Sequence, residues 1–352
     1  MYPVLFGEGV WALPSYFTMV MVGFVVGISL ARRQAEQAGW NVTKVIDLSL
    51  IILVMSILGA RLTHVVFDGY LHEYIELCRD PQSLAKLLPS GAQCTSDAAC
   101  VMAQNTGADI GENCIDGYCV PTRDCFRALK FWSGGLTYYG GFVFAFLTSV
   151  FLTRRWRMSF LKFADFAAPA IAIGVAFGRI GCFLAGCCFG KVTDVPWAVK
   201  FPLGSDAWKH QKDQLYDLLV AQHEATGQWT SLPVHPTQLY EALGCICIFL
   251  FIWFVLRKKK LPKGISIAFL LISYGIVRFI IEFFRDDMRG GYILSTSQWI
   301  SIPLVLLGVG LIIWGCRHPK DDGPELNGFT PEEETKKKKK GKKRKKKAKD
   351  NA

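Results

Sequence analysis

Seven apolar runs, each almost free of charged side chains, dominate this sequence of 352 residues. In a helix that rises 1.5 Å per residue, about 20 apolar residues cross the roughly 30 Å hydrocarbon core of a bilayer. The runs occupy residues 11–31, 45–67, 131–153, 163–187, 236–256, 264–284 and 292–316. The sequence therefore predicts an all-α polytopic membrane protein with seven transmembrane helices.

Composition agrees with a membrane protein, because 51% of the residues are hydrophobic, 20% are charged, and the mean hydropathy is +0.27. The formal net charge is +11, but residues 336–349 alone hold twelve Lys and Arg and no acid. The positive charge thus lies in one terminal run and not across a folded face, which disfavours a groove for nucleic acid. We expect no nucleic-acid partner.

Basic residues follow every second apolar run. They are Arg32, Arg33 and Lys44 after the first run, Arg154, Arg155, Arg157 and Lys162 after the third, and Arg257, Lys258, Lys259 and Lys260 after the fifth. Because basic loops stay in the cytoplasm, we expect the N-terminus outside and the C-terminus in the cytoplasm. No Lys or Arg precedes Arg32, so the first run lacks the charged leader of a cleavable signal peptide and is expected to be retained.

This topology divides the chain into parts with different expected structures. Residues 1–67 form the first two transmembrane helices, residues 68–130 an external cysteine-rich insert, and residues 131–316 the other five helices with an external loop at 188–235. The polybasic remainder, 317–352, has too few apolar residues to fold and is expected to be a disordered cytoplasmic tail held near anionic membrane lipids.

The insert holds six of the twelve cysteines: Cys78, Cys94, Cys100, Cys114, Cys119 and Cys125. An even number of cysteines in an oxidising compartment predicts three disulfides, although six cysteines allow fifteen pairings. A zinc site is the alternative, but no histidine lies between Tyr74 and Cys125 and the spacings are irregular. Disulfides are the interpretation that the sequence favours.

Ionisable side chains interrupt the apolar runs at one depth. Arg61, Arg179 and Arg278 lie in runs that cross from inside to outside, and each falls in the outer half. In the oppositely directed runs the polar residues come near the start, again in the outer half: Tyr16, Thr137, Tyr138, Tyr139, His235, Gln238, Tyr240, Glu241 and Gln298. Because ionisable groups in a membrane are costly, this layer is predicted to be functional.

Structural roles compete with function for these residues. Arg278, Glu282 and Arg285 share one helix face, so Glu282 could simply neutralise Arg278. Arg61 could extend to the outer surface, and His235 could mark a helix start before Pro236. Several arginines without matching acids nevertheless favour an anion, and a phospholipid phosphate suits guanidinium forks at this depth.

Six motifs then give the chain a resemblance to a known family. They are SGGLTYYGG at 133–141, AFGRIGCFLAG at 176–186, HPTQLYE at 235–241, YGIVRFIIEFFR at 274–285, Gly59-Ala60-Arg61 and Ser297-Gln298. In this order they resemble the prolipoprotein diacylglyceryl transferase family of bacterial inner membranes. The resemblance covers nearly all seven spans and leaves out the insert and the tail.

The resemblance implies a multi-pass enzyme of the bacterial inner membrane with a periplasmic N-terminus. Such enzymes transfer the diacylglyceryl group of phosphatidylglycerol to the lipobox cysteine thiol of a prolipoprotein signal peptide and release glycerol phosphate, the first step of lipoprotein maturation. The implied partners are phosphatidylglycerol, prolipoprotein signal peptides and membrane lipids. The scheme requires no cofactor and no metal.

The motifs also imply site residues. Arg179 and Arg278 resemble the family's essential arginines, the first at the lipid head group, while Tyr16 and Glu282 align with polar residues of the same cavity. Tyr139, Arg179 and Arg278 are the expected catalytic residues. The expected substrate-binding residues are Arg179, Tyr16, Arg61, Cys182, His235, Gln238, Glu241, Glu282 and Arg285.

Two departures from the family pattern keep alternatives open. Tyr139 replaces the usual histidine, and a phenol with a pKa near about 10 is a poorer base unless an arginine lowers it. Cys182, Ala185 and Cys187 replace Asn, Asn and Glu. Cys182, Cys187 and Cys188 could be inert packing residues, a disulfide, a reactive thiol or a covalent acceptor. The alternative functions are lipid transfer to another acceptor, and a lipid-binding or thiol-active membrane protein.

Overall fold

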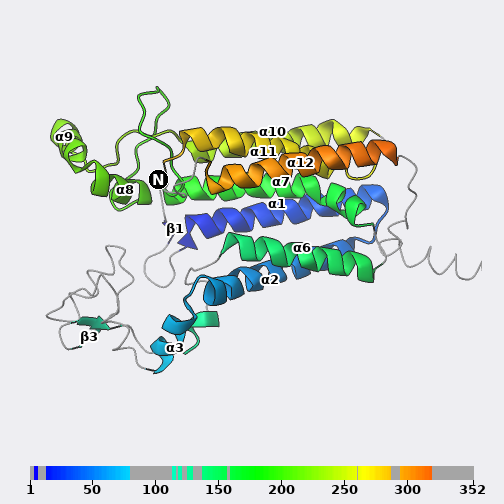
Figure 1. Cartoon of the computed structure of the whole chain (residues 1–352), viewed down its shortest axis with the longest axis horizontal. Coiled ribbons are helices and arrows are strands. Elements are labelled where there is room, and N and C mark those ends of the chain that lie inside the picture. The colour runs from blue at the N-terminus through cyan, green and yellow to red at the C-terminus, as the bar shows by residue number, and fades with distance from the viewer. Residues whose placement is uncertain are drawn as a thin grey trace, which may run out of the picture. The chain divides into compact units, whose positions relative to one another are not determined.

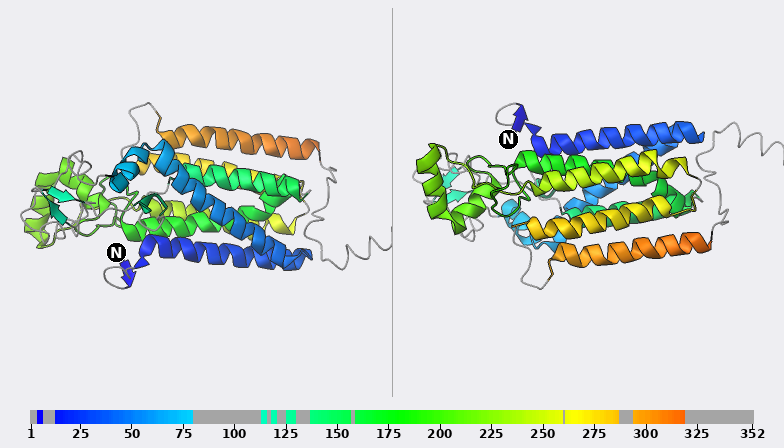
Figure 2. Two further views of the ribbon diagram at one scale, coloured as in Figure 1. Left: turned by 90° about the horizontal axis from the view of Figure 1, so that it is seen from below. Right: turned by 90° about the horizontal axis from the view of Figure 1, so that it is seen from above.

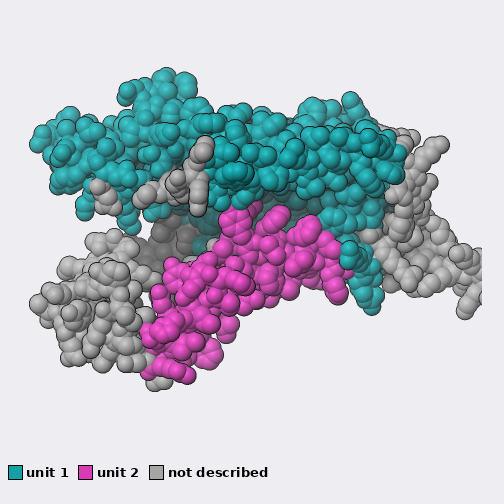
Figure 3. All heavy atoms as spheres, viewed as in Figure 1, with its two compact units in different colours: residues 1–46, 153–352 teal, residues 47–152 magenta. Residues whose placement is uncertain are grey.

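The computed structural model describes residues 4–6, 13–79, 113–115, 118–120, 125–129, 137–156, 159–259, 261–286 and 294–318. The chain divides into two compact units, one of residues 1–46 with 153–352 and one of residues 47–152. Figure 3 colours the two units separately. The tail expected to be disordered lies outside the described residues from 319 onward, as does the part of the insert that holds Cys94 and Cys100.

Five long helices form the body of the first unit: α1 (Ser15–Ala38), α7 (Phe160–Ala185), α10 (Thr237–Phe254), α11 (Ile265–Ile281) and α12 (Thr296–Arg317). They run alongside one another in Figures 1 and 2. Helix α7 packs against α1, α10 and α11, and α11 packs against α12. Small residues of α7, Ala168 and Ala172, meet Ile248, Ile252 and Leu270 in the core.

The helix ends are fixed by specific caps. Ser295 and Gln298 form a capping box at the start of α12, in which the Ser295 hydroxyl accepts from the Gln298 N–H and the Gln298 side chain accepts from the Ser295 N–H. At the other end of the bundle, the Asp165 carboxylate accepts from the backbone N–H groups of Gly264 and Ile267 (2.9 Å to Ile267) and so caps α11. These caps satisfy backbone donors that lack intrahelical partners.

The expected loop at 188–235 has a fold of its own. It contains α8 (Asp206–Gln214) and α9 (Tyr216–Thr226), which Figure 1 shows beyond the end of α10. Backbone bridges join Val234 to Val192 and Val199. Phe189, Phe201, Ala207 and Val234 form its small core. This segment is therefore a folded cap at the end of the helices that carries the polar residues.

The second unit contains most of α2 (Val42–Phe67), then α3 (Leu71–Arg79), strands β3 (Asn113–Ile115) and β4 (Tyr118–Val120), the 3-10 helix η2 (Arg127–Leu129) and α6 (Tyr138–Arg155). A disulfide joins Cys78 to Cys125, and Cys114 is also disulfide-bonded. One predicted disulfide of the insert is thus identified by its pair, while the expected total of three stays a prediction.

Arg61 has a structural role within this unit. Its Nε donates to the Ala128 carbonyl oxygen at 2.9 Å, and its guanidinium lies over the Tyr74 ring, 5.3 Å from the centroid. Only 7% of Arg61 is exposed, and both contacts come from residues of the expected external insert, so its extension toward the outer surface stays a prediction. The carbonyl and the ring provide partners that the sequence could not reveal.

Six described helices are long and apolar enough to span a membrane: α1, α2, α7, α10 with η4 (Leu256–Lys258), α11 with η5 (Glu282–Phe284), and α12. Helix α6 is not among them; it ends in Arg154 and Arg155, and the first residues of the predicted run 131–153 lie outside the described residues. The chain is thus a helical polytopic protein. Its described strands are short, and include β1 (Val4–Phe6) paired with β2 (Leu13–Pro14).

Candidate functional site

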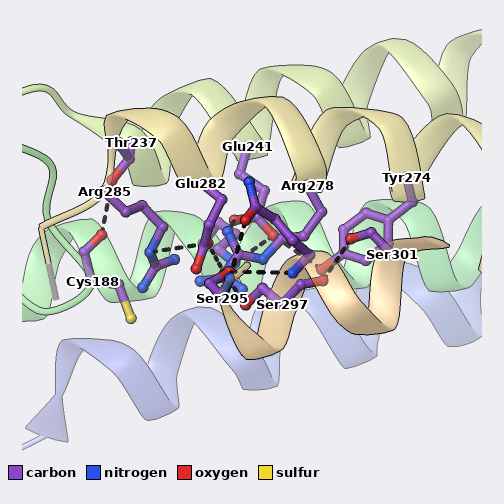
Figure 4. A network of polar contacts seen from close by, with 12 residues as sticks. Cys188, Thr237, Glu241, Tyr274, Arg278, Glu282, Arg285, Ser295, Ser297 and Ser301 are labelled. Carbon is purple, nitrogen blue, oxygen red and sulfur yellow. Dashed lines mark hydrogen bonds and ion pairs between the residues drawn. The ribbon is translucent and has the colours of Figure 1, made fainter. Parts of the chain in front are cut away.

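The polar residues of the first unit gather where α7 and α11 end and α10 and α12 begin. Figure 4 shows side chains of α10, α11 and α12 pointing toward one another, among them Glu241, Arg278 and Ser297. Arg179 comes from the last two turns of α7, Glu241 from the first turns of α10, and Arg278 from the last turn of α11. The antiparallel arrangement of the helices therefore brings together residues that lie far apart in the sequence.

Glu241 is at the centre of this cluster and is fully buried, with 0% exposed. Its Oε1 lies 3.0 Å from Arg179 Nε and accepts a 3.0 Å hydrogen bond from the Tyr274 hydroxyl. Its Oε2 lies 3.9 Å from Arg278 Nη1. One buried carboxylate thus orients two arginines from different helices, which fixes where their remaining N–H donors point.

A second carboxylate and a serine complete the cluster around Arg278. Nη2 of Arg278 lies 2.8 Å from Glu282 Oε2 and donates to the Ser297 hydroxyl at 2.7 Å. Arg285 Nε lies 4.0 Å from the same Glu282 oxygen. The structure therefore bears out the prediction that Glu282 can neutralise Arg278, and adds Ser297 of α12 as a further acceptor.

The cluster has unused capacity for an anion. Three arginines, Arg179, Arg278 and Arg285, gather around the carboxylates of Glu241 and Glu282. Among the described residues, the buried Nη1 of Arg278 has no hydrogen-bond partner. A buried donor without a partner costs about 1–3 kcal/mol, so an anion that accepts from it would be bound favourably.

Three cysteines lie together beside the cluster, at the end of α7. Helix α7 ends at Gly186, which has φ +80°, and the Cys187 N–H donates to the Cys182 carbonyl at 3.2 Å. This is the pattern of a Schellman motif, in which a left-handed glycine turns the chain back toward the last helical turn. The turn places the Sγ atoms of Cys182, Cys187 and Cys188 within 4.8 Å of one another.

The start of α10 holds this turn in place. The Thr237 hydroxyl donates to the Cys188 carbonyl at 2.9 Å, and Gln238 Nε2 donates to the Cys187 carbonyl at 2.6 Å. Gly181 lets α1 approach, because a Cβ there would lie 3.2 Å from the Tyr16 carbonyl oxygen. Tyr16 also interacts electrostatically with Cys182, Cys187 and Arg179, so it lies beside the cysteines and the arginine cluster.

His235 belongs to a neighbouring hydrogen-bond chain. Trp197 Nε1 donates to the Tyr240 oxygen at 2.6 Å, and the Tyr240 hydroxyl lies 3.2 Å from His235 Nδ1. The His235 backbone pairs with Lys191 and Gly190 of the folded cap. Its imidazole therefore has a fixed orientation next to the cysteine turn.

Comparison with known proteins places this site in a family. The family model described as prolipoprotein diacylglyceryl transferase matches residues 3–92 and 100–314. The chain belongs to this family.

Three relatives carry the name phosphatidylglycerol--prolipoprotein diacylglyceryl transferase. The protein from Paraburkholderia xenovorans (strain LB400) is 39% identical over 204 residues, 54% of this chain and 66% of that protein. The protein from Proteus mirabilis (strain HI4320) is 32% identical over 330 residues, 90% and 93% of the two chains, and that from Burkholderia ambifaria (strain MC40-6) is 31% identical over 336 residues, 90% and 95%. The family expected from the sequence is confirmed.

Within this member of the prolipoprotein diacylglyceryl transferase family, most of the predicted site residues meet in one unit. The first unit brings together Arg179, Tyr16, Cys182, His235, Gln238, Glu241, Glu282, Arg278 and Arg285. Arg61 and Tyr139 belong to the second unit, where Tyr139 is 54% exposed at the start of α6. Their part in the site stays a prediction.

Sequence reasoning overlooked the hydroxyl groups that complete the cluster. Tyr274 and Ser297 lie within the quoted motifs, but a hydroxyl in an apolar helix commonly bonds to its own backbone and gives no distinct signal. Their proximity to Glu241 and Arg278 depends on how α11 packs against α10 and α12. Thr237 was overlooked for the same reason, since its partner, the Cys188 carbonyl, is 49 residues away.

Proposed function

We propose that this chain transfers the diacylglyceryl group of phosphatidylglycerol to the cysteine thiol of prolipoprotein signal peptides. The observation that carries the proposal is the buried cluster in which Glu241 orients Arg179 and Arg278 while Arg278 Nη1 keeps an unused donor. A phosphodiester bears one negative charge and several acceptor oxygens, which suits those donors.

The chemistry requires a leaving phosphate whose charge is stabilised. The incoming sulfur forms a bond to the glyceryl carbon, the carbon–oxygen bond to phosphate breaks, and glycerol phosphate leaves with the electron pair. Arg278 and Arg179, already fixed by Glu241 and Ser297, stabilise that charge without reorganising. The nucleophile is the thiolate form of the substrate cysteine.

The chain lies in the bacterial inner membrane with seven spans, the N-terminus and the site outside, and the basic tail in the cytoplasm; the alternating basic residues support this orientation. Tyr139 takes part in catalysis and Arg61 in substrate binding. Phosphatidylglycerol, the signal peptide and surrounding membrane lipids are the partners.

Mass spectrometry of a lipobox peptide tests the function. Purified protein with phosphatidylglycerol should add a diacylglyceryl mass to the peptide cysteine, and Arg278→Ala should slow the reaction by roughly 10²–10³-fold, as loss of a preorganised donor does. Arg257→Ala is the matched control, because Arg257 stacks on Trp253 at the opposite end of α10. Equal rates for Arg278→Ala and wild type would overturn the proposal.

A further inference from the structure

The three cysteines at the end of α7 have the geometry of a metal site. Their Sγ atoms all lie within 4.8 Å of one another. Three thiolates around one zinc ion, each at about 2.3 Å, have sulfur–sulfur separations of about 3.8–4.0 Å, so only small side-chain rotations are required. Three soft sulfur ligands select zinc or copper(I) over hard cations such as magnesium.

The backbone holds these sulfur atoms in position before any ligand binds. Cys188 has φ +60°, a left-handed conformation that costs a non-glycine residue roughly 1–2 kcal/mol. The hydrogen bonds from Thr237 and Gln238 to the carbonyls of Cys188 and Cys187 keep the chain in this conformation. A strained turn that is held from a second helix points to a positional requirement on the thiols.

We propose that Cys182, Cys187 and Cys188 bind a zinc ion whose open fourth position takes the substrate cysteine as a thiolate. This inference rests on the proposed function and departs from the sequence-based expectation of no metal. Three protein ligands and one open position are the arrangement of catalytic zinc, and a thiol that coordinates zinc is deprotonated.

When the substrate sulfur coordinates zinc, its proton passes to water. A sulfur lone pair then forms the bond to the glyceryl carbon, and the electron pair of the broken carbon–oxygen bond goes to the phosphate that Arg278 and Arg179 hold. The product thioether is a neutral, weaker ligand and leaves the metal. No oxidant or reductant is required.

Cobalt(II) binding to the full-length protein as purified, with its insert disulfides intact and measured without oxygen, tests the metal site. We expect one cobalt per chain, with the near-ultraviolet charge-transfer absorption of cobalt–thiolate bonds. Cys187→Ser, and Cys182→Ser with Cys188→Ser, should lose this absorption. Cys247→Ser with Cys316→Ser should keep it, because these free cysteines lie elsewhere on α10 and α12. Wild-type protein without stoichiometric cobalt–thiolate absorption, or with two of the three cysteines joined as a disulfide, would overturn the proposal.

Zinc depletion of wild-type protein tests the catalytic role. Metal-depleted protein should transfer lipid at least tenfold more slowly, should regain activity with added zinc, and should still bind phosphatidylglycerol vesicles. Full activity without metal would refute the zinc role and leave the proposed function intact. A zinc-loaded protein that never transfers lipid would refute the proposed function and the catalytic role together, while cobalt absorption would still report the metal site.

Discussion

At the scale of single residues, Glu241 and Tyr274 make contributions of different size to the same cluster. Glu241→Gln removes the charge that compensates Arg179 and Arg278, and breaking such a buried pair costs about 3–5 kcal/mol. Tyr274→Phe removes the hydrogen bond to Glu241, worth about 1 kcal/mol. We expect thermal unfolding in detergent and initial transfer rates to show a large loss for the first variant and a small one for the second. Equal losses of stability and rate in the two variants would mean that the Glu241 charge does not hold Arg179 and Arg278 in place.

The same scale shows what the sequence could predict of the site. Arg179, Arg278 and Glu282 were predictable because charged side chains are conspicuous in apolar runs. The neighbours that fix them were not, since Ser297 and Tyr274 are ordinary polar residues until helix packing brings them within 3.0 Å of a charged group. Cys182 and Cys187 were noticeable in the sequence because they depart from the family pattern. Their proximity to each other and to Cys188 depends on the turn at Gly186, which the sequence did not predict.

At the scale of helices, the packing of α11 against α12 positions Ser297 beside Arg278. Gly308 of α12 makes this approach possible, because a Cβ there would lie 2.9 Å from the Ala268 carbonyl oxygen. Gly308→Leu should separate the helices, lower the free energy of unfolding by about 1–3 kcal/mol and slow transfer. Gly310→Leu is the control, since no described atom lies within 4 Å of a Cβ there. If Gly308→Leu changed neither the free energy of unfolding nor the transfer rate, the site would tolerate a displaced α12.

Helix positions followed from the sequence better than the loops did. The runs 236–256 and 264–284 correspond to α10 at Thr237–Phe254 and α11 at Ile265–Ile281, because hydrophobicity over a membrane-spanning length determines both. Helices α8 and α9 were not predicted, since short polar helices depend on tertiary contacts. Phe201, with 0% exposed, provides one such contact because it packs in the same core as Ala207 of α8. It lies outside any periodic apolar pattern in the sequence.

At the scale of the whole molecule, the chain is electrically asymmetric, and this asymmetry predicts its orientation. Basic residues follow alternate apolar runs, and twelve more lie in residues 336–349. Basic segments resist export, so the tail should remain in the cytoplasm while the disulfide between Cys78 and Cys125 forms on the oxidising side.

Proteolysis of a chain with an epitope at its C-terminus tests this orientation. Trypsin should remove the epitope completely from inside-out membrane vesicles, because the lysine run faces the protease there, and should leave it on intact spheroplasts. Spheroplasts opened with detergent provide the control that the run can be cleaved. Removal of the epitope from intact spheroplasts would invert the topology and place the arginine cluster at the cytoplasmic end of its helices. It would also put the Cys78–Cys125 disulfide in a reducing compartment, so the two observations constrain one another.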